Sequence, residues 1–344
     1  MTDSLKPEKL KQWQASASFE LIKLRADTLR TIRSFFDKNG VLEVDTPVLS
    51  SASIPDPFIE SFQTRYIPLT QTMQTEDYYL HTSPEFPMKR LLASGSGSIY
   101  QISKVFRQGE SGRKHNPEFT LLEWYRDGWD HHQLMHEVCQ LLTLILAPNI
   151  ELADPQFLSY EDAFQTVLGI NPHTVNKTDL LACTEKAGLA NVLDDNEHRD
   201  RFLELLFSHT IEPSLGRNRG KTSNLPCICL LYHYPASQAS LAKTALQNGQ
   251  LIAERFEVFI DGMELGNGFH ELNDAKEQKA RFEADNQARK QMGHNEIPMD
   301  DNFLEAVGHL PECAGVAIGI ERLLMIMSQS QHINDVIAFP FERA

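Results

Sequence analysis

The 344-residue sequence has no long uninterrupted apolar run. Its first residues, MTDSLKPEKLKQWQ, contain no apolar core of the length found in signal peptides. No later stretch approaches the roughly 18 uncharged apolar residues that a membrane-spanning helix requires. We therefore expect no membrane partner and a cytoplasmic location.

Cysteine is scarce, and its five positions are an odd number scattered through apolar surroundings. This pattern lacks the paired spacing of a disulfide framework or a zinc site. Cys227 and Cys229 stand two apart, which places them on one face of a strand, as in a hydrophobic core. We expect reduced, buried thiols and assign no metal to them.

Positive charge is in short supply, with 32 Lys and Arg against 47 Asp and Glu and a net charge of -15. A chain with this excess of negative charge lacks the broad basic surface that binds a nucleic-acid backbone. This argues against tRNA as a partner. The loop with Arg217, Arg219 and Lys221 is a candidate basic patch, with an ordinary solvated loop as the alternative.

Hydrophobic periodicity predicts an α+β fold. Phe19, Ile22, Leu29, Ile32 and Phe36 recur at helical steps, and Asn39-Gly40 ends that helix. We expect helices at 17–39, from Ser83-Pro84-Glu85 onward, at 131–147 and at 273–293, and strands at 41–44, 99–106, 117–126, 227–232, 255–260, 263–266 and 316–318. Residues 148–224 read as a polar, mostly helical insertion. Strands gathered early and late predict an antiparallel sheet flanked by helices, not alternating βαβ units.

The segment from Lys104 to Arg126, KVFRQGESGRKHNPEFTLLEWYR, is locally basic in an acidic chain. An apolar strand ends at Arg107, a charged loop follows, and an aromatic strand returns. The segment reads as two strands that present cations to a phosphate. The alternative is an ordinary hairpin with a solvated, charged tip.

Three motifs carry a family resemblance. Arg107 to Glu110, His115 to Phe119 and Glu123 to Tyr125 resemble motif 2 of class II aminoacyl-tRNA synthetases, above all the lysyl-tRNA synthetase branch. Gly315 to Leu323 resembles motif 3, and the first helix, its strand and Pro47 resemble motif 1, which lies at the dimer interface of the family. Glu254 to Asn273 resembles the lysine-binding and metal-binding segment. The resemblance implies the class II catalytic fold, ATP and Mg²⁺ as cofactors, and a homodimer.

The resemblance also implies roles for individual residues. Arg107 would hold the α-phosphate of ATP and Arg322 the outer phosphates, as the catalytic arginines. The ATP site would comprise Arg107, Gln108, Gly109, Glu110, His115, Asn116, Phe119, Glu264, Leu265, Gly319 and Arg322, with Mg²⁺ on Glu257 and Glu264. The amino-acid site would comprise Ser83, Pro84, Glu85, Tyr125, Asn267, Phe269, Glu271 and Ala317. In it Glu271 and Tyr125 would hold the distal ammonium, and Glu85 the amino group.

Two positions depart from the family pattern. Gly109 stands where motif 2 usually has glutamate, and Glu110 follows it as a candidate substitute. Ala317 stands where lysyl-tRNA synthetases tend to have glycine, so that its methyl group could reshape the amine pocket.

The whole length resembles the bacterial elongation factor P lysine ligases, which are truncated lysyl-tRNA synthetase paralogues. HTSPEFPMKRLL, YHYPASQASLA and NGFHELNDAKEQ match phrases of that family. We therefore expect one catalytic domain over residues 1–344, without an anticodon-binding domain. The resemblance implies activation of (R)-β-lysine, or less well lysine, and transfer to a lysine side chain of elongation factor P.

Three alternatives remain at this point. An ammonia-dependent asparagine synthetase has a similar core, but Glu271 would repel a substrate carboxylate. A lysine-activating ligase could serve another acceptor. A non-catalytic binding paralogue would be expected to lack some of the residues Arg107, Glu257, Glu264 and Arg322, and all four are present.

Overall fold

The computed structural model describes the chain except residues 1–10, 12, 70–75, 195 and 218–224. Arg219 and Lys221 of the predicted basic patch, and the end of the predicted insertion, lie outside the described residues. Among the helices that are described, none has both the length and the apolarity of a membrane span.

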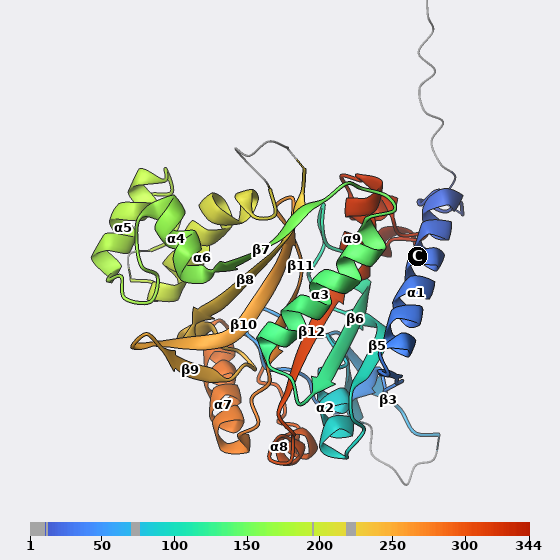
Figure 1. Ribbon diagram of the computed structural model, residues 1–344. Helices are drawn as coiled ribbons and strands as arrows, with labels where there is room; N and C mark the ends of the chain where they lie inside the picture. Colours follow the sequence, from blue (N-terminus) through green and yellow to red (C-terminus); the bar gives the residue numbers. More distant parts are fainter. Residues whose placement is uncertain (1–10, 12, 70–75, 195, 218–224) are drawn as a thin grey trace, which may run out of the picture.

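A large, mostly antiparallel sheet organises the described chain (Figure 1). It is nine-stranded, in the order β1-β5-β6-β12-β11-β10-β8-β7, with β9 paired to β10. Its strands are β1 (Leu42–Glu43), β5 (Ile99–Phe106), β6 (Glu118–Asp127), β7 (Ala153–Ser159), β8 (Cys227–Pro235), β9 (Thr244–Gln247), β10 (Gln250–Ile260), β11 (Met263–His270) and β12 (Cys313–Gly319). Only the outermost pairs of that order, β1 with β5 and β7 with β8, run parallel. The predicted α+β class is confirmed.

Alternating side chains give this sheet two different faces. On β6, Leu122 and Trp124 belong to the main hydrophobic core, whereas Glu123 and Tyr125 point to the opposite face. The core face is covered by α1 (Phe19–Lys38), α3 (His131–Leu146) and α9 (Ile320–Ser328) (Figure 1). The opposite face carries the polar cavities described below.

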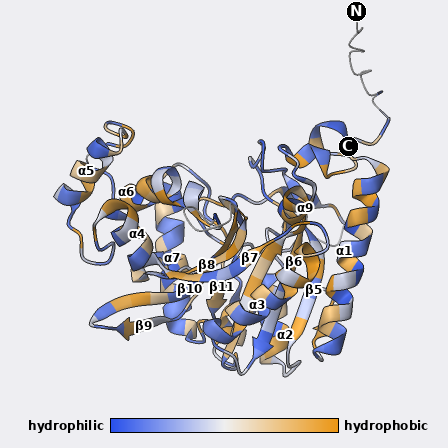
Figure 2. Ribbon diagram, turned by 45° about the horizontal axis from the view of Figure 1, so that its top comes forward, coloured by the Kyte–Doolittle hydropathy of each residue, from blue (hydrophilic) through white to orange (hydrophobic). Residues whose placement is uncertain are grey.

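The helix predicted at 131–147 illustrates how local sequence sets an element boundary. Asp130 caps α3 by accepting from the backbone N–H of Gln133, whose side chain accepts in turn from the N–H of Asp130. Apolar residues then fill the helix side that packs on the sheet, including Leu134, Val138 and Leu142. Figure 2 shows the resulting contrast between hydrophobic central strands and polar outer helices such as α7 (Ala275–Gln291).

The predicted insertion at 148–224 is helical in part. It contains α4 (Tyr160–Leu168), α5 (Lys177–Lys186) and α6 (Arg199–Leu206), which build a second core against β8 and β10. It also contains β7, which the sequence analysis read as helical. This edge strand is largely exposed and includes Pro155, which lacks a backbone N–H and fits only at a sheet edge. Its sequence therefore lacks the alternation of apolar and polar residues that would predict a strand.

Smaller elements complete the site face. They are α2 (Glu85–Ala93), α8 (Asp301–Val307) and a second sheet of β2 (Leu49–Ser50), β3 (Gln63–Tyr66) and β4 (Glu76–Leu80). Ser83 was predicted to cap α2, but Pro84 occupies the cap position. The hydroxyl of Ser83 still accepts a hydrogen bond from the backbone N–H of Glu85 at 3.0 Å. Serine side chains commonly bond to the backbone two residues later in this way.

Candidate active site

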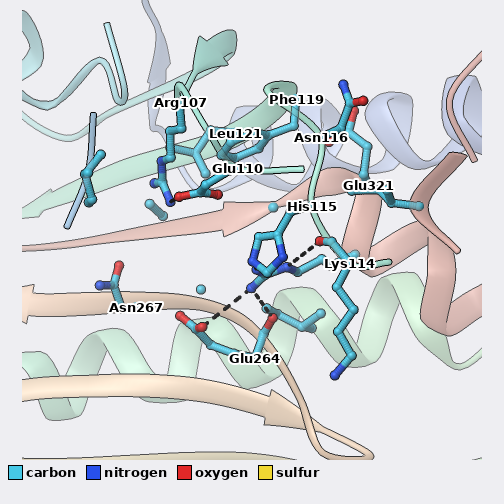
Figure 3. Close-up of a pocket in the computed structure, with 17 residues that line it drawn as sticks. Arg107, Glu110, Lys114, His115, Asn116, Phe119, Leu121, Glu264, Asn267 and Glu321 are labelled. Carbon is cyan, nitrogen blue, oxygen red and sulfur yellow. Dashed lines mark hydrogen bonds and ion pairs between the residues drawn. The ribbon is translucent and has the colours of Figure 1, made fainter. Parts of the chain in front are cut away.

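A cavity of about 240 Å³ opens beside the loop that joins β5 to β6 (Figure 3). We call it the arginine cavity. Its lining comprises Ile59, Arg107, Glu110, Lys114, His115, Asn116, Phe119, Leu121, Glu264, Leu265, Gly266, Asn267, Ala317, Gly319, Glu321, Arg322 and Ile333. Most of these residues come from the motif 2 hairpin, from β11, and from β12 with the start of α9; Ile59 and Ile333 complete the lining. The fold thus brings together segments that are far apart in the sequence.

Arg107 follows the last residue of β5 and is held from three sides. Its guanidinium lies 5.1 Å from the centre of the Phe119 ring, and its Nη1 lies 3.7 Å from Oε1 of Glu110. Its Nε donates to the carbonyl oxygen of Thr82 at 3.4 Å. These contacts orient a planar group that is still about a quarter exposed, with 26% of its side chain accessible. Such a fork suits bidentate contact with a phosphate or a carboxylate.

Gly109 has a physical reason to replace the usual glutamate. Its φ is +83°, in the left-handed region that residues with a Cβ atom rarely adopt. Glu110, the next residue, lines the arginine cavity and faces Arg107. The glutamate is therefore displaced by one position while its carboxylate remains beside the arginine.

Arg322 organises the other wall of the cavity. Its Nη2 donates to Nε2 of His115 at 2.7 Å, and its Nη1 donates to the carbonyl oxygen of Glu264 at 2.8 Å. Figure 3 labels these two partners. The carboxylate of Glu264 lies 3.5 Å from the same Nη1. Burial, and then the charge of Arg322, lower the pKa of His115, so its neutral ring can accept this hydrogen bond. Residues from the hairpin, β11 and α9 thus form one network.

Asn116 is buried at the cavity wall with its amide fixed in orientation. Its Nδ2 donates to the carbonyl oxygen of Glu118 at 2.5 Å, and its Oδ1 accepts from the N–H of Phe341 at 3.1 Å. Phe119 lines the same cavity, where one part of its ring is covered by Arg107.

A second cavity, of about 220 Å³, adjoins the first. We call it the acidic cavity. Its lining comprises Ile54, Asp56, Ile59, Thr82, Ser83, Glu85, Arg107, Leu121, Glu123, Tyr125, Ser240, Leu241, Arg255, Asn267, Phe269, Glu271, Gly315, Val316 and Ala317. Five residues line both cavities: Ile59, Arg107, Leu121, Asn267 and Ala317. Arg107 therefore stands where the contents of the two cavities would meet.

The floor of the acidic cavity holds a buried ion pair. Nζ of Lys89 lies 2.6 Å from Oε2 of Glu271 and 2.5 Å from Oε1 of Glu85. Lys89 and Glu271 each expose only 1% of their side chains. Burial opposes ionisation of Lys89, but the charges of Glu271 and Glu85 raise its pKa overall. The predicted amine-binding carboxylate thus already has an internal cation.

Glu123 adds a third carboxylate to this cavity. It accepts from the hydroxyls of Ser83 and Tyr125, both at 2.6 Å. Burial, and then the charge of Glu85, raise its pKa to about 8, and burial, against the charge of Lys89, raises that of Glu271 to about 7. The two arginines that line the cavity, Arg107 and Arg255, already lie beside other carboxylates, those of Glu110 and Glu257. The remaining acidic groups outnumber Lys89. The cavity therefore favours a ligand that brings positive charge.

Glycine on β12 leaves room for such a ligand. A Cβ atom at Gly315 would lie 2.3 Å from the ring of Tyr125 and 2.4 Å from Oε1 of Glu271. The space beside these two side chains therefore depends on the absence of a side chain at Gly315. Ala317, two residues along the same face, lies where the two cavities adjoin.

Glu257 and Glu264 lie on the hairpin of β10 and β11, joined by a turn in which Asp261 and Gly262 both have positive φ. Glu264 lines the arginine cavity, whereas Glu257 is buried behind it and bonded to Arg255. Burial raises the pKa of Glu257, Arg255 opposes this shift, and the charge of Glu264 adds to it. Two carboxylates that repel each other suit a shared Mg²⁺ ion, which takes one or two carboxylates together with phosphate oxygens.

Most residues predicted for the site line one of the two cavities. Those that line neither are Pro84, Gln108, Gly109 and Glu257. Pro84 occupies the cap of α2, and Gln108 bridges to Glu60 through the backbone. Pro84, Gln108 and Gly109 are each next to a lining residue in the sequence, so they shape the site through the backbone. Glu257 differs, because its carboxylate is buried and paired with Arg255.

The sequence analysis missed Glu123, Lys89 and Gly315 as site residues. Strand alternation could have found Glu123, because it stands two residues before Tyr125 on the same face. Helical spacing could have found Lys89, four residues after Glu85. Nothing local marks Gly315, whose close neighbours come from other strands.

Comparison with known proteins agrees with this arrangement. Residues 5–343 match the family model described as tRNA synthetases class II (D, K and N). The chain is 45% identical over 334 residues to an elongation factor P–(R)-β-lysine ligase of Pectobacterium atrosepticum, covering 96% of this chain and 98% of the relative. Ligases of the same name from Vibrio parahaemolyticus and Salmonella paratyphi B are 46% and 44% identical, with the same coverage.

Proposed function

Since this chain belongs to the class II tRNA synthetases, in the family of elongation factor P–(R)-β-lysine ligases, we propose that it attaches (R)-β-lysine to elongation factor P. In the first step, ATP activates the amino acid as an adenylate, with lysine as a poorer substrate. In the second, the acyl group passes to a lysine side chain of the factor. The chain acts as one catalytic domain with a helical insertion.

The observation that carries this proposal is the junction of the two cavities at Arg107. Adenylate formation requires an amino-acid carboxylate to attack the α-phosphate of ATP in line, so two anions must be held side by side. A guanidinium at the junction can contact both and stabilise the charge that develops on the phosphate. Arg322 and His115 would hold the outer phosphates, and Asn116 and Phe119 the adenine.

The acidic cavity supplies substrate selection. Glu85, Glu123 and Glu271 surround it, and Lys89 balances only part of their charge. Lysine and (R)-β-lysine each carry two ammonium groups, so both match this excess of acid. An uncharged side chain would leave buried carboxylates without partners, which costs about 3–5 kcal/mol for a broken buried pair. Aspartate would be repelled outright.

Mg²⁺ completes the proposed ATP site. Glu264 in the arginine cavity, with Glu257 behind it, would hold the ion. When bound, Mg²⁺ neutralises charge on the phosphates. Nη1 of Arg322 lies 3.5 Å from Oε2 of Glu264, and this contact would fix the orientation of the carboxylate toward the ion.

We also propose a homodimer that works in the cytoplasm, where translation factors act. Two leucines that flank Pro47 in the sequence are exposed on edge strands: Leu42 on β1, with 57% of its surface accessible, and Leu49 on β2, with 49%. Exposed apolar side chains at an unpaired sheet edge are typical of an interface. Sedimentation or light scattering of the wild type and of Leu42→Asp tests this: the wild type should be dimeric and the variant should dissociate.

The experiment that tests the function is a mass measurement on elongation factor P after incubation with the chain, ATP, Mg²⁺ and (R)-β-lysine. The mass should rise by one β-lysyl residue, and the rise should require ATP. Pyrophosphate exchange should be stronger with (R)-β-lysine than with lysine. Charging of lysine tRNA at a comparable rate would contradict the proposal, and exchange without any acceptor modification would favour a different protein acceptor.

A further inference from the structure

Three histidines gather on the core face of the sheet, away from both cavities. His131 and His132 begin α3, and His233 lies on β8. One ring nitrogen from each lies within 4.8 Å of the others. His131 and His233 are buried, whereas His132 is exposed. We call this group the histidine cluster; none of its members has a role in the proposed ligase reaction.

The two buried rings of the cluster have nearly the spacing of two ligands on one metal ion. Nε2 of His131 lies 3.1 Å from Nε2 of His233. Zinc bonds of about 2.0–2.1 Å in tetrahedral geometry place two ligand nitrogens roughly 3.3–3.4 Å apart. The ring centres of His132 and His131 lie 5.3 and 5.2 Å from that of His233. A small movement of the rings would bring all three nitrogens onto one ion.

Hydrogen bonding alone does not account for burying these rings. Nδ1 of His131 is buried without a hydrogen-bond partner among the described residues. His233, a residue with a Cβ atom, is held at φ +61°. Both features cost free energy. Zinc on Nε2 of His131 would leave its Nδ1 unchanged, so the strained backbone of His233 is the feature that supports a function for this cluster.

His270 lies nearby, with its ring centre 6.3 Å from that of His131, but it has a different role. Its Nδ1 and Nε2 contact the carboxylates of Glu254 and Glu312 at 2.7 and 3.0 Å. Burial opposes protonation of this ring, but the hydrogen bond to Glu254 raises its pKa overall. His131, Glu254 and His270 also have ligand atoms within 4.8 Å of one another. Both ring nitrogens of His270 already contact carboxylates, so we assign the ion to the histidine cluster, beside which Glu254 places negative charge.

We propose that His131, His132 and His233 bind a zinc ion. Three imidazole nitrogens and a water molecule form a tetrahedral set that zinc accepts. Mg²⁺ prefers oxygen ligands, so this site would be separate from the proposed Mg²⁺ site of ATP. The exposed His132 gives the ion a path from solvent, and it would be the ligand that completes the site on binding.

The test uses untagged full-length protein, stripped with a chelator and titrated with zinc chloride by calorimetry. We expect one tight zinc equivalent per chain, confirmed by elemental analysis after dialysis. Loss of outer-sphere partners lowers zinc affinity by about 10–100-fold. Removal of a ligand by His132→Gln should therefore weaken it by at least about tenfold. Cobalt, as a coloured substitute, should give the intense visible bands of a tetrahedral site.

His136→Gln is the matched control, because His136 is exposed on the same helix and lies outside the cluster. It should leave zinc affinity unchanged. His132→Gln removes an exposed side chain, so its fold is expected to survive, and circular dichroism checks this. Equal zinc binding by His132→Gln and the wild type, the absence of a saturable equivalent, or an octahedral cobalt spectrum would each overturn the proposal.

Discussion

The ammonium group of Lys89 lies 2.6 Å from the carboxylate of Glu271, and each side chain is 99% buried. Two carboxylates that line the acidic cavity, those of Glu271 and Glu85, therefore share a buried cation before any substrate enters. A substrate ammonium would not meet an isolated carboxylate at Glu271. It would join a network in which Lys89, Glu85 and Glu271 already share charge.

Lys89→Met should destabilise the protein strongly. The substitution keeps the volume of the side chain but leaves Glu271 and Glu85 buried without their cation, which costs about 3–5 kcal/mol. Urea unfolding should show this loss. Lys104→Met is the control: Lys104 pairs with Glu118 at 3.2 Å on the surface, with 47% of its side chain exposed, and such pairs contribute at most about 1 kcal/mol. Similar losses in the two variants would contradict the assignment of Lys89 as an essential internal cation.

Gly315→Ala should exclude the amino acid while sparing ATP. The added methyl group would lie within 2.5 Å of Tyr125 and Glu271 in the acidic cavity, and Gly315 does not line the arginine cavity. We expect KM for (R)-β-lysine to rise by at least about tenfold, the equivalent of about 1.4 kcal/mol. Equilibrium binding of ATP should change little.

Gly308→Ala is the control for that prediction, since a Cβ atom at Gly308 meets its nearest neighbour at 3.4 Å and its φ is not positive. It should behave as the wild type in both measurements. An equal loss of ATP binding in Gly315→Ala would mean that the substitution distorts the sheet and not the amine pocket alone.

Gly109→Ala should impair the motif 2 loop through its backbone. A Cβ atom would meet nothing within 4 Å, so the cost comes from φ +83° and amounts to about 1–2 kcal/mol. Gly112→Ala is matched closely, because Gly112 lies in the same loop, also has open space, and has no positive φ. We expect KM for ATP to rise in Gly109→Ala only. Identical kinetics in both variants would show that loop conformation at Gly109 does not limit ATP binding.

The strands and helices that carry this site could be predicted from the sequence better than the ion pairs inside it. The strands at 99–106 and 117–126 and the helix at 131–147 are confirmed, because their periodicity and caps are local signals. The meeting of Arg107, His115 and Arg322 could be expected from the family resemblance. The pairing of Lys89 with Glu271 could not, because the two residues are far apart in the sequence and Glu271 was expected to pair with the substrate.

The edge of the sheet was also hard to predict. Strand β7 is mostly exposed and carries Pro155, so neither alternation nor β-propensity marks it. Its strand character comes from pairing with the buried β8, which is a tertiary contact. Propensity is overridden by such contacts most easily in short, polar segments.

The stability of the substrate-free protein should fall as pH rises from about 4.5 to about 8. Burial raises the pKa of Glu123 to about 8 and that of Glu271 to about 7, above the ordinary 4.5 of a glutamate in an unfolded chain. Between these values the folded state binds more protons than the unfolded state. The free energy of unfolding therefore decreases with pH across this window, and the contribution of the protonated pair is complete only below about pH 4.5.

A diamine substrate should reverse this effect. Two ammonium groups favour the ionised carboxylates, so binding of (R)-β-lysine should release protons and raise the melting temperature more at pH 8 than at pH 6. Calorimetry in buffers of different ionisation enthalpy measures the proton release directly. Glu123→Gln, whose amide mimics a neutral acid, should flatten the pH dependence of stability and reduce the release. If the slope of stability against pH is the same in Glu123→Gln and the wild type, Glu123 is not the group that holds the proton.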